Sequence, residues 1–133
     1  MRNVRVFLSI AALANLAVAL WHLYLGRDAP GLLGTAPMRI ASLTGTLTLL
    51  GVALLWTRYP KTGSLVLIVV LALGFFMGCL EHFFVAGPYN VFDVGSGHWV
   101  LPFDITVALL VVFQVAGLSA AGACSQPALK AGR

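Results

Sequence analysis

Charged side chains are scarce in this chain: Asp, Glu, Lys and Arg make up 9% of its 133 residues, whereas a soluble domain carries roughly 25%. Hydrophobic residues make up 60%, and the mean hydropathy is +0.98. This composition excludes a soluble globular domain, a disordered segment and a nucleic-acid-binding protein. We therefore expect an integral membrane protein whose principal partner is the lipid bilayer.

Cysteine and the familiar metal motifs are also scarce. Cys79 and Cys124 are the two cysteines, and they lack the CxxC spacing of zinc sites and thioredoxin-type redox sites. The sequence contains no HExxH or ExxH pattern either. We expect Cys79 near one membrane face and Cys124 near the other, which excludes disulfide exchange between them. Any chemistry of this chain must therefore come from histidines and carboxylates.

Long apolar runs dominate what is present. They cover residues 4–25, 40–56, 63–85 and 99–121, and roughly 20 helical residues cross a bilayer core about 30 Å thick. Connections with glycine and proline separate the runs and favour antiparallel neighbours. The sequence therefore predicts an all-α, integral membrane four-helix bundle over residues 1–123, followed by a short cytoplasmic tail at 124–133.

Positive charge is distributed unevenly along this four-span topology. Six of the eight cations fall on one side, namely Arg2, Arg5, Arg58, Lys61, Lys130 and Arg133. Arg27 and Arg39 fall on the other. Cations accumulate on the cytoplasmic side of membrane proteins, so we expect both termini in the cytoplasm, with the chain in a bacterial inner membrane.

The first apolar run allows a second interpretation. Basic residues followed by an apolar stretch and Ala17-Val18-Ala19 resemble a cleaved signal peptide. The apolar run continues without interruption to Leu25, which favours a first membrane span instead. Both interpretations stay open at this stage.

The acids and histidines all fall at the outer side of the predicted bundle. Asp28 and Asp93 lie in connections, where a solvated charge needs no special explanation. The others are His22, Glu81, His82, His98 and Asp104. Three imidazoles and two carboxylates suit zinc, copper or iron. We therefore predict a ligand-binding or metal-binding site at the outer mouth of the bundle.

Glu81 is the most unusual of these residues. It lies near the end of the third span, where the helix dipole disfavours a carboxylate. A regular α-helix places it on the face of Gly74 and Gly78, whose small-xxx-small spacing lets another helix approach closely. We therefore expect Glu81 to point into the bundle and approach His22.

Other polar residues are expected to help pack the helices. His22 shares a helical stripe with Asn15, and Thr44 and Thr48 share one on the second span, where they offer hydroxyl donors to the interior. The fourth helix is expected to begin near Leu101-Pro102, so that Asp104 stands near its N-terminus, where the dipole favours negative charge. The sequence thus predicts a partly polar bundle interior.

Two further features carry expectations. His22 and His82 are candidate axial ligands of a single haem b, and the lack of a second histidine tier excludes two stacked haems. The outer connection at 87–99 is expected to cover the bundle mouth or to lie at the interface through Tyr89, Phe92 and Trp99.

The functions that remain fall into two main classes. The first is binding of a metal ion or a small polar ligand at the outer site, linked to membrane redox chemistry or to proton relay, with catalysis left open. The second is a non-catalytic accessory subunit of a larger membrane complex, or a homo-oligomer. In the second class the polar cluster is a salt-bridge network in which Glu81 pairs with Arg27 or Arg39.

Overall fold

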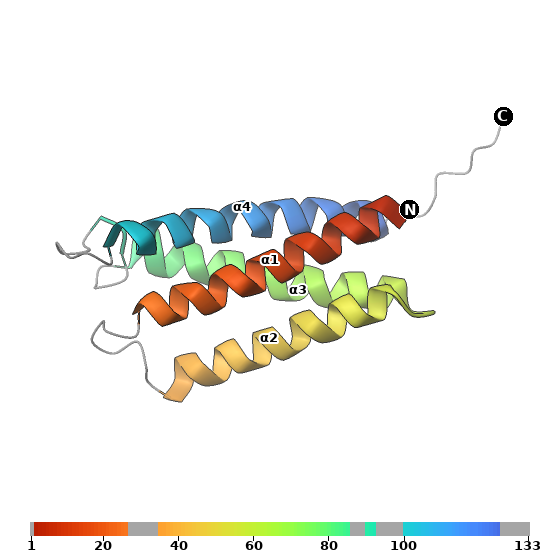
Figure 1. The fold of residues 1–133 in the computed structure, drawn as a ribbon, viewed down its shortest axis with the longest axis horizontal. Coiled ribbons are helices and arrows are strands. Elements are labelled where there is room, and N and C mark those ends of the chain that lie inside the picture. Colours follow the sequence, from red (N-terminus) through yellow and green to blue (C-terminus); the bar gives the residue numbers. More distant parts are fainter. Residues whose placement is uncertain (1, 27–34, 86–89, 93–99, 126–133) are drawn as a thin grey trace.

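Four helices form the part of the chain that the computed structural model describes, which comprises residues 2–26, 35–85, 90–92 and 100–125. They are α1 (Arg2–Gly26), α2 (Thr35–Leu55), α3 (Pro60–Cys79) and α4 (Val100–Ser125), and a π-helical segment, η1 (Leu80–Phe84), continues α3. Consecutive helices run in opposite directions, so the start of α1 and the end of α4 lie at the same end (Figure 1). The predicted all-helical class is confirmed, and each helix coincides with a predicted apolar run.

Three of the helices are long and apolar enough to cross a membrane. The qualifying stretches are Arg2–Leu25, Pro60–Phe84 and Leu101–Cys124, of 24 or 25 residues each. At 1.5 Å per residue such a stretch is about 36 Å long, which exceeds the hydrocarbon core of about 30 Å. The apolar part of α2 is shorter, from Arg39 to Leu55.

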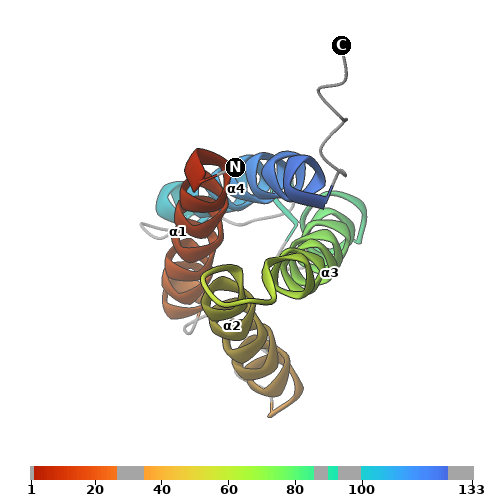
Figure 2. The same cartoon turned by 90° about the vertical axis from the view of Figure 1, so that its right-hand side faces the viewer.

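The helices pack around a shared interior, but not evenly. α4 lies between α1 and α3 and contacts both extensively, while α2 packs mainly on α3 (Figure 2). Contacts between α1 and α2 are far fewer. The starting end of α2 diverges from the other helices. The bundle is therefore tightest along α4 and loosest between α1 and α2.

An apolar core closes the end where the chain begins. Its fully buried members come from all four helices: Leu8, Ala12, Leu55, Leu67, Leu71 and Ala121. Here α2 and α3 approach each other at backbone distance, since a Cβ atom added to Gly63 would lie 2.7 Å from the carbonyl oxygen of Gly51. Pro60 starts α3 in its first turn, where proline is well tolerated. The short turn between Leu55 and Pro60 and the absence of a side chain at Gly63 thus allow α2 and α3 to pack at backbone distance.

Large apolar side chains also cover the outside of the bundle. Ile10, Leu43 and Phe76 are each about 60% exposed, and many similar residues surround them. Monomeric soluble proteins rarely carry so much contiguous apolar surface, but lipid solvates it well. The surface and the helix lengths together indicate a membrane location.

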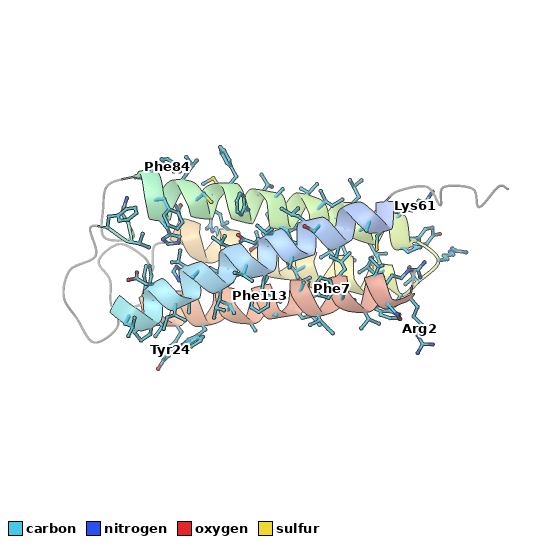
Figure 3. All side chains as sticks on the ribbon, turned by 90° about the horizontal axis from the view of Figure 1, so that it is seen from above. Arg2, Phe7, Tyr24, Lys61, Phe84 and Phe113 are labelled. Carbon is cyan, nitrogen blue, oxygen red and sulfur yellow. The ribbon has the colours of Figure 1, made fainter. Side chains whose placement is uncertain are left out.

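The two ends of the bundle differ in charge. Arg2 and Lys61 lie at one end, and Tyr24 and Phe84 at the other (Figure 3). Arg5 and Arg58 belong to the Arg2 end by their positions in the chain, and Arg39 belongs to the opposite end. The described cations are thus distributed as the predicted topology requires. Arg27, Lys130 and Arg133 lie outside the described residues, and the assignment of this end to the cytoplasm stays a prediction.

Candidate functional site

His22 on α1 and Thr106 on α4 join two helices at the end opposite the chain start. Both side chains are buried, and His22 Nδ1 lies 2.8 Å from Thr106 Oγ1. The same antiparallel register brings Ala11 of α1 beside Gly117 of α4, further along the pair. The regular packing of α1 on α4 therefore positions this hydrogen bond.

The Thr106 hydroxyl determines which ring nitrogen of His22 carries the proton. Its oxygen lies 2.6 Å from the carbonyl oxygen of Phe103 and donates its single proton there. The hydroxyl must then accept a hydrogen bond from His22, so Nδ1 of His22 carries the ring proton. This tautomer leaves Nε2 as the acceptor atom of the ring.

His82 brings a second imidazole to His22. The ring centroids are 4.9 Å apart and the planes are nearly perpendicular, at 84°. The ring of Phe103 packs against both, at 4.3 Å from His22 and 5.7 Å from His82. All three side chains are buried. We call His22, His82, Thr106 and Phe103 the histidine cluster; it is built from α1, η1 and α4.

His82 lies within η1, where the helix widens from α to π geometry. The backbone N–H of Val85 donates to the carbonyl of Leu80, five residues earlier, at 2.9 Å. A π-turn contains more residues than an α-turn and so shifts every later side chain around the helix axis. Such turns are found mostly as single insertions in α-helices and often at functional sites.

The expectation that Glu81 points into the bundle is wrong. Helical periodicity puts Glu81 on the face of Gly74 and His82 on the adjacent flank, about 100° away. In the structure His82 is buried beside His22, and Glu81 is exposed. The predicted approach of an acid to His22 is therefore an approach of a second histidine.

The two glycines of α3 have different surroundings. A Cβ atom on Gly74 would lie 3.0 Å from Nε2 of Gln114, so Gly74 makes room for a buried amide from α4. A Cβ atom on Gly78 would meet no atom within 4 Å. The predicted close packing is found at Gly74, whereas Gly78 borders open space.

The other predicted packing residues are also resolved. Asn15 is buried on α1, and its Oδ1 atom has no hydrogen-bond partner in the described structure. Thr48 is buried and Thr44 is half-buried on α2. Both hydroxyls donate to carbonyls of their own helix, Thr44 to Ile40 and Ala41, and Thr48 to Thr44. The expectation that these threonines offer their protons to the interior is therefore wrong.

Asp104 lies just beyond the first turn of α4, near the N-terminus of the helix as expected, and follows Phe103 in the chain. The side chain is half-buried, and its Oδ1 atom is buried without a partner in the described structure. His98, the fifth predicted site residue, lies outside the described residues, as do Asp28 and Asp93. The structure thus brings His22 and His82 together and leaves His98 as a prediction.

The outer connection is described only at Asn90–Phe92. Its Phe92 ring packs against Phe83 of η1 at 6.3 Å between centroids. The N–H of Val91 donates to the carbonyl of His82 at 2.9 Å. These residues therefore bind the end of η1, and Tyr89 and Trp99 lie outside the described residues.

No family model matches the chain, and no curated protein or solved structure matches it significantly. The function must therefore be argued from the site itself.

The donor set of the histidine cluster is nitrogen and hydroxyl oxygen. A histidine whose Nδ1–H is held by a hydrogen bond is oriented as metal-ligating histidines are, with the other nitrogen available for coordination. Within the described part of the chain, no three His, Cys, Asp or Glu side chains lie close enough together to hold a metal ion. Asp104 is among these described residues, so it does not complete a metal site with His22 and His82. Of the predicted ligands, His98 lies outside the described residues and stays a prediction.

A haem does not fit the observed geometry. Axial histidines lie on opposite faces of the porphyrin, so the whole macrocycle must pass between the two rings. Here the two rings are in edge-to-face contact, and Phe103 packs against both. We therefore drop haem b from the candidates for the His22–His82 pair.

Sequence reasoning missed Thr106, Phe103 and Asn90. The first two lie on the buried stripe of α4 that also contains Gln114, so helical periodicity could have indicated an interior position for them, but not that they are partners of His22. Asn90 carries no sequence signal, because its partners are backbone groups of Val85 and Phe92.

Proposed function

We propose that this chain is a small integral membrane protein with four spans whose histidine cluster binds a metal ion or a small polar ligand near the outer membrane face. The observation that supports this proposal most directly is the Thr106–His22 hydrogen bond. It makes Nε2 of His22 an acceptor next to a second buried imidazole. Buried polar groups in a membrane are costly, and such residues mark functional sites more often than structural ones.

The burial of polar side chains supports a ligand at one end of the bundle. The histidine cluster lies at the end where α2 diverges, and Asn15 and Gln114 are further buried polar residues nearer the middle of α1 and α4. At the opposite end Leu8, Leu67 and Leu71 close the interior. A ligand would therefore enter at the histidine end and would not pass through.

The test is elemental analysis and native mass spectrometry on protein purified in mild detergent without chelators, followed by titration with Zn²⁺ and Cu⁺. We expect a stoichiometric metal or a retained small molecule in the wild type. His22→Ala and His82→Ala should lose it while the helical circular dichroism persists, because one lost ligand does not unfold apolar spans.

Glu81→Gln is the matched control, since this residue precedes His82 but is exposed. It should keep the bound species. Wild-type protein that carries neither a metal nor a small molecule, and that binds neither Zn²⁺ nor Cu⁺, would contradict the proposal.

A second function is favoured by a different observation. Gly78 is half-buried, and a Cβ atom there would meet no atom within 4 Å; small residues in a membrane helix let another helix pack closely. We infer as the alternative an accessory subunit that docks a partner helix, or a second copy, at this face. Gly78→Leu should then disrupt the complex seen by crosslinking in native membranes without affecting the histidine cluster.

A further inference from the structure

A second pair of buried polar side chains lies deeper in the bundle than the histidine cluster. Asn15 on α1 is 9% exposed, and Gln114 on α4 is 6% exposed. Asn15 precedes His22 by seven residues, which is about 10 Å along a helix at 1.5 Å per residue. A single ion cannot bridge that distance, so this pair is separate from the histidine cluster.

Packing contacts on both sides place Asn15 and Gln114 at one level of the α1–α4 pair. One turn nearer the chain start, a Cβ atom on Gly117 would lie 3.8 Å from the Cβ atom of Ala11. About two turns nearer the other end, the α1–α4 hydrogen bond of the histidine cluster follows the same register. The two amides therefore lie at the same depth, and both are buried between the helices.

The surroundings leave the Asn15 amide oxygen in need of a donor. Its Oδ1 atom is buried and has no hydrogen-bond partner among the described residues, so the Gln114 amide does not donate to it. Backbone N–H groups at this depth are bonded within their own helices. An amide oxygen buried without a partner costs free energy, which a donor from outside the chain would recover.

Gly74 of α3 provides room at the same place. A Cβ atom on Gly74 would lie 3.0 Å from Nε2 of Gln114, so the glycine lets the donor end of this amide stand between α3 and α4. One acceptor and one donor thus occur at one level of a mostly apolar interior. A hydroxyl group, which donates one hydrogen bond and accepts others, matches this pair.

We propose that Asn15 and Gln114 form a second polar site that binds one hydroxyl group, supplied by an ordered water molecule or by the hydroxyl-bearing end of a small ligand. The hydroxyl donates to Oδ1 of Asn15 and accepts from Nε2 of Gln114. Buried water molecules bind to polar groups that are otherwise unsatisfied in this way. The site goes beyond the proposed function, because it does not depend on what the histidine cluster binds.

Nuclear magnetic resonance of the full-length protein in detergent micelles tests the site directly. The chain contains two glutamines and three asparagines, so ¹⁵N-labelled Gln and Asn give few side-chain NH₂ signals, and Gln114→Glu identifies the Gln114 signal by its loss. We expect a dipolar cross-peak from the Gln114 NH₂ group to water if water supplies the hydroxyl, or to protons of a retained molecule if a ligand supplies it. Paired NOE and ROE spectra separate such a contact from proton exchange by the sign of the cross-peak.

Two substitutions of Asn15 link the cross-peak to its amide oxygen. Asn15→Leu has a similar size and removes the acceptor, so the cross-peak should disappear. Asn15→Asp keeps an acceptor oxygen at the same place and should retain it.

Ser64→Ala is the matched control. Ser64 is also fully buried, but its hydroxyl already donates to the carbonyl of Ala121 at 3.1 Å. Its removal should leave the Gln114 cross-peak unchanged.

Two results would overturn the proposal. A wild-type Gln114 signal without a cross-peak to water or to a retained molecule would show that the amides are buried dry, and this spectrum decides by itself if Asn15→Leu does not fold. A cross-peak that persists unchanged in folded Asn15→Leu would show that Asn15 does not hold the hydroxyl. Both results are independent of the metal titrations at the histidine cluster.

Discussion

The two ends of the bundle keep their helices together in different ways. At the end where the chain begins, aliphatic side chains fill the interior and α2 meets α3 at backbone distance. At the other end, imidazole, hydroxyl and phenyl groups meet where α2 diverges. The first end is built for close packing, and the second holds costly polar groups in a membrane-like interior.

Polar groups occur at the packed end too, but there they form single, separate hydrogen bonds between parts of the bundle. Ser64 Oγ donates to the carbonyl of Ala121 at 3.1 Å, and Trp56 Nε1 donates to Ser9 Oγ at 3.0 Å. The first bond joins α3 to α4, and the second joins the turn after α2 to α1. The difference between the ends teaches that clustering of polar groups, rather than their mere burial, distinguishes a candidate site from helix packing.

The largest expected effect is at the packed end. Leu71 is fully buried and lies over Gly117, so Leu71→Ala should lower the free energy of unfolding by about 2 to 5 kcal/mol, as cavity-forming substitutions do. Steric-trapping or denaturant unfolding in micelles measures this. Any species bound at the histidine cluster should be retained by the folded fraction; its loss would mean that the two ends are coupled.

Gly63 and Gly78 allow the packing at the two ends of α3 to be compared directly. A Cβ atom on Gly63 would lie 2.6 Å from the backbone nitrogen of Leu55, so Gly63→Ala must push α2 from α3 and should cost about 1 to 3 kcal/mol. Gly78→Ala meets no atom within 4 Å and should be neutral. Thermal denaturation of the two variants in one detergent is the measurement. Equal melting temperatures would contradict the close α2–α3 contact.

At the histidine end, Thr106 should affect binding more than folding. Thr106→Val keeps the shape but leaves His22 Nδ1–H without its acceptor, which should cost about 1 to 3 kcal/mol and abolish binding at the cluster. Thr106→Ser keeps the hydroxyl and should retain binding. If Val and Ser bind equally, the hydroxyl does not orient the imidazole.

The smallest effect is expected at Glu81. Because this side chain is exposed, Glu81→Gln should change the free energy of unfolding by less than about 0.5 kcal/mol. His82→Gln, one residue later, should have a larger effect on binding. A strong effect of Glu81→Gln would restore the inward orientation expected from a regular helix.

The sequence by itself determined the helical class, the positions of the helices and the end at which the histidines lie. These features follow from local chemistry: long apolar runs, glycine and proline between them, and cations at alternate connections. His22 was recognised as a buried residue for the same reason, since it lies on one stripe with Asn15. Continuous helical periodicity is enough to assign such a face.

Only the tertiary structure decided which side chain meets His22. That choice depends on how η1 packs against α1 and α4: His82 lies against His22 and Phe103, and Glu81 is exposed. It also depends on the α1–α4 register that brings Thr106 to Nδ1. A helical period places Glu81 and His82 about 100° apart, on the two flanks of the face that α3 buries. Periodicity alone therefore does not decide between them, and the neighbouring helices do, because they bring the rings of His22 and Phe103 to His82.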